Sequence, residues 1–166
     1  MSNKYRTHNC SELRKEHVKE DVILSGWVNK KRDHGNLLFI DLRDNYGVTQ
    51  CIIDKENSNF GQLEKIQLET VITIEGKVLS RSKETVNQDI HTGEIEVGIK
   101  QFKVLGACKE LHLPVFSDQE YAEDIRLKYR FLDLRRKKIH ENIILRSKVI
   151  SFLMNEITFD LKIIFL

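Results

Sequence analysis

The residues best suited to chemistry in this sequence form an aromatic and basic group. In the segment 37–43 (LLFIDLR), strict alternation places the aliphatic side chains at 38, 40 and 42 on one side and Phe39 on the other, among charged side chains. The basic run Lys30 to Arg32 comes shortly before it. An aromatic ring on a polar face beside positive charge suits a nucleic acid base stacked next to its phosphates. The alternative is that a loop or helix covers Phe39 and makes it part of a second core.

Composition limits the classes of protein that need to be considered. The chain has 166 residues, 40% of them hydrophobic, which predicts one domain, or one domain with an appendage, around a real core. A formal net charge of +2 is small, so a nucleic acid contact would depend on local clusters of charge. The sequence contains neither a membrane-spanning run nor an apolar leader at its start, which predicts a cytoplasmic protein without a membrane partner.

Metal and nucleophile chemistry have little support in the sequence. The three cysteines, Cys10, Cys51 and Cys108, are far apart and outside any CxxC spacing, which argues against a disulfide framework or a zinc site. The six histidines do not form a helical i, i+4 pair, and glycine-rich phosphate loops are absent. We therefore expect neither a metal site nor a catalytic residue.

The periodicity predicts elements that would position Phe39. A short helix is expected over 11–17 with Ser11 as N-cap. Strands over 22–29, 37–44 and 48–53 follow, with a bulge or a sharp coil at Gly26. A helix with one buried stripe is expected over 57–68. Strands over 70–79 and 94–105 follow, separated by a long polar loop, with a second bulge near Gly98.

The resulting order, β-β-β-α-β-β, is that of the OB-fold, a mainly β, five-stranded Greek-key barrel that binds oligonucleotides or oligosaccharides. We expect an N-terminal helical extension over 1–20, the barrel over 21–106, a linker and basic hinge over 107–138, and a helix with an aberrant tail over 139–166. Between Arg126 and Lys138 seven basic side chains stand against one acidic side chain. Such a run is most often a solvated helix face, but its density is compatible with phosphate contacts.

The phrases GWV, KKRDHG, FIDLRD, TGEIEV and RLKYRFLDLRR occur collinearly. In this order they resemble the N-terminal region of bacterial-type aspartyl-tRNA synthetases, from about Tyr5 to about Asn155. The resemblance implies an anticodon-binding OB domain joined by a hinge to a class II catalytic domain, with tRNA as partner.

The resemblance also implies a set of anticodon contacts. Phe39 matches an aromatic that stacks on a base, Gln50 an amide that reads the central uridine, and Glu96 a carboxylate that accepts from the first base, a guanosine. Alternation independently places Glu96 on the wet face of its strand. The other implied contacts are Arg32 in the turn between the first two strands, and Arg81 and Asn87 in the long loop.

Further candidates are less specific. Lys30, Lys31, Arg135 and Arg136 are candidate phosphate contacts. His34 stands where the family varies between His and Leu, and it hints at tolerance of the asparagine anticodon. Ile52 replaces an aromatic of many members, which puts a second stacking ring in doubt.

The sequence departs from the family after RSKVISFL, where MNEITFDLKIIFL replaces the expected strand of the first class II signature. We therefore expect a chain truncated before the catalytic domain and inactive in aminoacylation, with no cofactor of its own, since ATP and magnesium serve the full-length family. The homodimer is expected for the full-length enzyme and a monomer for this chain. Residues 157–166, apolar and β-prone, are expected to be disordered or prone to aggregate.

Two alternatives remain. One is a free-standing OB-fold protein that binds single-stranded nucleic acid, against which the hinge segment RLKYRFLDLRR argues. The other is the anticodon domain of a related asparagine or lysine synthetase.

Overall fold

The computed structural model describes residues 4–109, 111–115 and 119–164, and the chain divides into two compact units, residues 1–110 and 111–166. The first unit contains the strands β1 (Asp21–Asp33), β2 (Leu37–Arg43), β3 (Val48–Asp54), β4 (Val71–Ser80) and β5 (Ile95–Gly106), with helix α1 (Phe60–Lys65) between β3 and β4. This order confirms the expected β-β-β-α-β-β arrangement.

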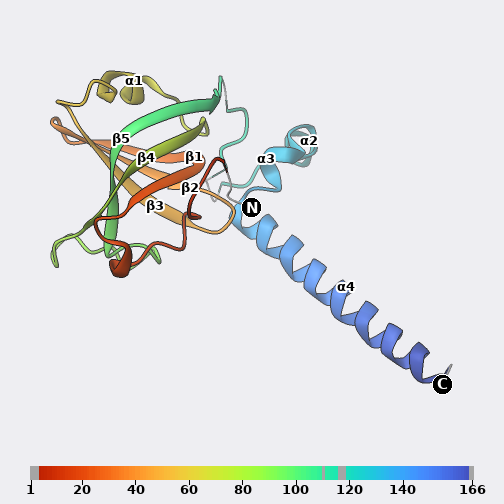
Figure 1. Ribbon diagram of the computed structural model, residues 1–166. Coiled ribbons are helices and arrows are strands. Elements are labelled where there is room, and N and C mark those ends of the chain that lie inside the picture. Colours follow the sequence, from red (N-terminus) through yellow and green to blue (C-terminus); the bar gives the residue numbers. More distant parts are fainter. Residues whose placement is uncertain (1–3, 110, 116–118, 165–166) are drawn as a thin grey trace. The chain divides into compact units, whose positions relative to one another are not determined.

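The five strands close into a barrel in the order β1-β2-β3-β5-β4 (Figure 1). All neighbouring pairs are antiparallel except β3 and β5, which run parallel where Cys51 faces Val97. The parallel pair closes the sheet and completes the Greek key, so the predicted mainly β OB-fold class is confirmed.

Alternation along the strands builds the barrel core. On β2 the side chains at 38, 40 and 42 are buried and their neighbours are only partly so, as a period of two requires. On β4 the buried positions are 72, 74, 76 and 78, and β5 begins with Ile95, Val97 and Ile99 inward. Phe39 is thereby placed on the outer face of the barrel.

The N-terminal segment is part of the barrel unit rather than a helical extension. Cys10 and Leu13 are fully buried in the barrel core. The Cys10 N–H donates to the Asp44 carboxylate at 2.9 Å, and its carbonyl accepts from Thr49 Oγ1 at 2.9 Å. The helix predicted over 11–17 is wrong except for a 3₁₀ turn, η1 (Lys15–His17). With these anchors residues 10–12 form a turn, and the backbone is extended at Arg14, where the dihedrals are −137° and 177°.

Of the bulge or sharp coil expected at Gly26, the bulge is wrong. The register between β1 and β2 shifts at Asn29. The register between β4 and β5 shifts twice, at Lys100, two residues beyond Gly98, and at Leu105. Gly26 is required for a different reason, because a Cβ there would overlap the carbonyl oxygen of Arg43 on β2. The glycine allows a close approach of two strands.

Helix α1 is shorter than the predicted 57–68 and buries Phe60 and Leu63. Before it, the Asn57 side chain donates to the carbonyls of Ile99 and Lys100, which holds this residue outside the helix. After it, the Lys31 ammonium donates to the carbonyl oxygens of Glu64, at 2.7 Å, and Ile66. A lysine on a strand therefore satisfies carbonyl groups at the end of the helix.

The second unit contains α2 (Glu123–Lys128), α3 (Arg130–Asp133) and α4 (Lys137–Ile164). Its small core is formed by Leu113, Val115 and Leu132. The fully buried carboxylate of Asp133 pairs with three guanidinium groups, those of Arg126 (3.2 Å), Arg130 (2.6 Å) and Arg136 (3.7 Å). Three of the seven basic side chains between Arg126 and Lys138 thus neutralise one buried acid.

Helix α4 continues through residues that were expected to be disordered or prone to aggregate, and the expected disorder is wrong for 157–164. Residues 157–164 belong to it, while 165 and 166 lie outside the described residues. A helix satisfies its backbone groups within itself, so an apolar segment can adopt it without a neighbouring strand. Within the described part of the chain, helices long and apolar enough to cross a membrane are absent.

Candidate nucleic-acid interface

A line of polar side chains crosses the outer face of the barrel from β2 to β5. Arg32 Nη2 donates to Asp41 Oδ1 at 2.9 Å and to Gln50 Oε1 at 3.0 Å. Gln50 Nε2 donates to Glu96 Oε2 at 3.1 Å. Arg81 Nε lies 3.5 Å from the same Glu96 oxygen, an ion pair too poorly aligned for a hydrogen bond. We call these five residues the polar line.

The strands bring the polar line together from distant parts of the sequence. Asp41 on β2 faces Gln50 on β3 directly, and Arg32 on β1 faces Phe39 on β2. The parallel pairing of β3 with β5 then places Glu96 one position before Val97, the partner of Cys51. Four residues of the polar line, all but Asp41, are candidates from the sequence.

The polar line combines alternating charges with buried polar atoms that need hydrogen-bond partners. Its charges alternate in sign from Asp41 to Arg81, with the neutral Gln50 in the middle. Gln50 is only 4% exposed, so its amide depends on protein partners. Nε of Arg32 and Nε of Arg81 are buried without hydrogen-bond partners in the described structure. A buried donor without an acceptor is costly, and an oxygen or nitrogen acceptor of a ligand would relieve it.

Phe39 stands beside the polar line as a half-buried ring. It faces Arg32 on one side and Ile52 on the other. The His34 ring meets it edge to face, with centroids 5.3 Å apart at 87°. Among the described residues, the partly buried hydrophobic side chains packed on the barrel core are Val18, Ile66 and Phe102. Phe39 is therefore outside the barrel core.

Arg81 and Asn87 belong to the loop between β4 and β5 but occupy different places. The Arg81 side chain is 4% exposed, and its Nη1 donates to the Gly93 carbonyl at 3.2 Å. The Asn87 backbone N–H donates to the same carbonyl at 3.1 Å. A Cβ on Gly93 would overlap the Asn87 carbonyl oxygen. Gly93 thus joins the two arms of the loop, with Arg81 at its base.

The four candidate phosphate contacts differ in their exposure and in their contacts within the protein. Lys30 is exposed, whereas the Lys31 ammonium is used at the end of α1. Arg136 is held by Asp133 and donates to the Gln119 carbonyl at 2.5 Å, and Arg135 lies in the same second unit. Lys30 is thus an exposed candidate on β1, where it pairs with Asp41 on β2. Asp41 was missed, although its place on the same strand face as Phe39 was a usable signal.

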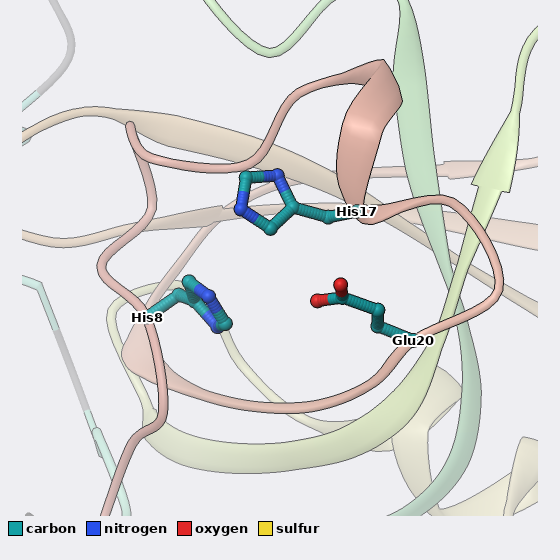
Figure 2. A group of neighbouring side chains, drawn as sticks. All are labelled: His8, His17 and Glu20. Atoms are coloured by element: carbon teal, nitrogen blue, oxygen red, sulfur yellow. The ribbon is translucent and has the colours of Figure 1, made fainter.

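A second polar group lies on the N-terminal segment. His8, His17 and Glu20 point toward one another, with ligand atoms within 4.8 Å (Figure 2). His17 Nδ1 accepts the Arg14 backbone N–H at 3.0 Å, so the proton of the neutral ring is on Nε2. A metal ligand needs an unprotonated nitrogen, so an ion bound at Nε2 would have to break the bond to Arg14. His17 serves here to cap η1, and the expectation of no metal site stays a prediction.

The closed five-stranded barrel, with a polar line and a ring on its outer face, defines the class of OB-fold binding domains. Residues 22–105 match the model of the tRNA anticodon family, described as an OB-fold nucleic acid binding domain, and the chain belongs to this family.

Relatives with curated names are similar to nearly the whole chain. The aspartate–tRNA(Asp/Asn) ligase of Pelagibacter ubique is 75% identical over 94% of this chain, and that of Parvibaculum lavamentivorans is 53% identical over 93%. This chain spans only 26% of the length of each of these relatives.

Solved structures support the fold. An aspartyl-tRNA synthetase from Entamoeba histolytica superposes with a TM-score of 0.77 at 21% identity, covering 90% of this chain and 36% of that one. The asparaginyl-tRNA synthetase from Pyrococcus horikoshii, complexed with asparaginyl-adenylate, gives 0.67 at 23% identity, covering 90% and 34%. At these identities the likeness is one of fold.

Proposed function

We propose that the barrel recognises the anticodon of tRNA and supplies this part of an aspartate–tRNA(Asp/Asn) ligase. The observation that carries the proposal is the polar line, in which a buried amide, a carboxylate and two guanidinium groups with unused donors meet beside a half-buried ring. The names of the relatives, which state a ligase acting on tRNA, support it.

The chemistry of these groups fits the edges of unstacked bases. Gln50 both donates and accepts, which suits the central uridine with its N3–H donor and carbonyl acceptors. Glu96 only accepts, which suits the N1–H and N2–H₂ donors of a guanosine in the first position. A base stacked on Phe39 contributes about 1–3 kcal/mol.

The guanidinium groups and the loop complete the proposed site. Arg32 donates to Gln50 through Nη2 and Arg81 donates to the Gly93 carbonyl through Nη1, and the Nε of each is buried without a hydrogen bond. Lys30 offers its charge to a phosphate, and Asn87 lies in the loop that would close over the anticodon. The binding energy from such phosphate contacts falls as salt concentration rises.

We further propose that both aspartate and asparagine tRNAs are accepted. Both curated relatives carry Asp/Asn in their names, and His34 stands against the stacking ring at 5.3 Å. The two tRNAs share the first two anticodon bases, G and U, and differ in the third. A site that reads the first two through Glu96 and Gln50 would tolerate either third base.

Aminoacylation is proposed for a longer protein, with ATP and magnesium as its cofactors, in which this chain supplies tRNA selection. Such a ligase would act in the cytoplasm as a homodimer. The residues described here contribute by binding and orienting RNA.

The direct test measures affinity for anticodon stem-loop RNAs. The 166-residue chain is titrated with loops bearing GUC, GUU and an unrelated anticodon, and Phe39→Ala is compared with Tyr46→Ala, which removes an exposed ring in the β2–β3 turn. We expect GUC and GUU to bind alike and more tightly than the unrelated loop. Phe39→Ala should weaken binding roughly tenfold or more, from the loss of one stacked base.

Tyr46→Ala should leave the affinity unchanged. Equal affinities for all three loops would contradict anticodon recognition. GUC binding far more tightly than GUU would contradict only the dual specificity.

A further inference from the structure

The amide of Gln50 is held at both ends by groups that allow only one orientation. Arg32 Nη2 lies 3.0 Å from Oε1, and Glu96 Oε2 lies 3.1 Å from Nε2. A guanidinium can only donate and a carboxylate can only accept. The carbonyl end of Gln50 must therefore face Arg32 and the NH₂ end must face Glu96, so the chemistry of the partners fixes the orientation.

A fixed amide matters because a glutamine that can turn over does not distinguish the two pyrimidines. Uracil presents an N3–H donor beside the O4 acceptor, and cytosine presents an N3 acceptor beside the N4–H₂ donor. Turning the amide by 180° exchanges donor and acceptor, which would convert a match for one base into a match for the other. For a base held in one place by stacking, the held amide complements one pyrimidine only.

Arg32 needs an anchor of its own to hold Gln50. Its side chain is 39% exposed and ends a long flexible stem, so solvent competes for its guanidinium. The anchor is Asp41, whose Oδ1 accepts from the same Nη2 at 2.9 Å and whose side chain is 17% exposed. Both hydrogens of Nη2 are thereby used, one on Asp41 and one on Gln50.

We propose that Asp41 is a positioning residue that sets pyrimidine selectivity at the central anticodon base by holding Arg32, and through it the amide of Gln50, in one orientation. The inference rests on the proposed anticodon recognition. Asp41 itself need not touch the RNA. Its influence passes through Arg32, which makes it a specificity determinant distinct from the contacts that the family resemblance implies.

The test compares binding of stem-loop RNAs with GUC and GCC anticodons, which differ only at the central base. The variants are Asp41→Ala, Asp41→Asn, which keeps the side-chain volume, and the control Glu75→Ala, which removes an exposed strand carboxylate from β4. The unaltered chain should prefer GUC by roughly tenfold or more, the discrimination of a two-point contact on one base edge.

Asp41→Ala should reduce this preference to about threefold or less, mainly because the GCC loop binds more tightly than before. Asp41→Asn, which keeps an acceptor but loses the charge, should reduce it by a smaller factor, and Glu75→Ala should not change it. A general loss of structure would weaken both loops equally and leave the ratio intact.

The possible failures can be told apart. If the unaltered chain shows no preference, the proposed anticodon recognition fails, and the inference about Asp41 fails with it. If the unaltered chain prefers GUC and both Asp41 variants keep the full ratio, the inference is overturned while the recognition stands.

Discussion

Individual charged residues of this chain divide into those that hold the fold and those that remain open to a ligand. Lys31 satisfies the end of α1, and burial lowers the pKa of its ammonium while the nearby Glu64 carboxylate acts in the opposite sense. Arg136 is held by the buried Asp133. From the sequence, Lys31 and Arg136 were both candidate phosphate contacts. A basic side chain can bind a phosphate or a group of its own protein, and only its neighbours in the fold decide which of the two it binds.

Two cysteine thiols are altered by their burial in the barrel core. Cys10 and Cys51 are fully buried in the barrel core. Burial raises the pKa of each well above its ordinary value, and the carboxylates of Asp44 (for Cys10) and Asp41 (for Cys51) act in the same direction. Both groups therefore stay protonated in the folded protein under alkaline conditions that ionise an ordinary thiol.

Stability should consequently fall in alkali. A thiol ionises near pH 9.0 in the unfolded chain, and a raised folded pKa means that its contribution is complete below that pH and is lost as pH rises. Each thiol should lower the free energy of unfolding by about 1.4 kcal/mol per pH unit above pH 9. Urea unfolding at a series of pH values measures this slope.

The matched comparison is between the double variant Cys10→Ala/Cys51→Ala and the single variant Cys108→Ala, since Cys108 is only partly buried. The double variant should have a shallower slope and Cys108→Ala should match the unaltered chain. Identical slopes for all three proteins would contradict this account.

Two glycines allow backbone segments of this barrel to approach each other closely. The loop between β4 and β5 closes on Gly93, whose carbonyl accepts from Arg81 and from the Asn87 backbone. Gly26 lets β1 approach β2 in the same way. These glycines are needed because other atoms occupy the space of a side chain, a reason that the sequence does not reveal.

Gly93→Ala should distort the loop and loosen Arg81 from Glu96. The methyl group would overlap the Asn87 carbonyl, so we expect a loss of roughly 1–3 kcal/mol in the free energy of unfolding, as for other overpacked sites. Affinity for the GUC stem-loop should fall as well, because Arg81 loses its place beside Glu96. Chemical denaturation and RNA titration measure the two effects.

Gly61→Ala provides the contrast. Gly61 lies in α1, and a Cβ there meets nothing within 4 Å, so the substitution should stabilise the protein by about 0.5–1 kcal/mol through helix propensity. Equal effects of the two substitutions would show that the overlap at Gly93 is relieved without cost.

The molecule as a whole consists of two units with separate cores. The barrel core runs from Cys10 to Ile99, and the second core is the small cluster around Leu132. Large apolar side chains of α4 remain exposed in the described structure: Ile143, Ile144, Leu145, Val149, Ile150, Phe152, Leu153, Met154 and Ile157. Exposed apolar surface of this kind promotes association.

Deletion of residues 139–166 should therefore improve solubility and leave the barrel intact. We expect the free energy of unfolding of the barrel to be unchanged, since its core contains no α4 residue, and light scattering to decrease. The paired substitution Leu145→Lys/Phe152→Lys should have the same effect on scattering without shortening the chain. Scattering that persists in both proteins would place the cause elsewhere.

Much of the barrel was predictable because its signals are local. Alternation with a period of two gave the inward faces of β2, β4 and β5, and the change of period located α1. The N-terminal helix and the bulge at Gly26 were wrong because contacts from β2 and β3 override local preference there. The burial of Cys10 and Leu13 in the barrel core was not predicted, since two isolated apolar residues show no helical or strand periodicity.

The sequence by itself determined the order of the strands along the chain, the outward position of Phe39 and the residue types able to read a base. Only the tertiary structure decided that Arg32, Gln50 and Glu96 form one hydrogen-bonded line with Asp41 as its anchor. Hydrogen bonds between side chains up to 46 residues apart depend on strand register and barrel closure. Those are set by the packing of the whole core, which local sequence patterns do not specify.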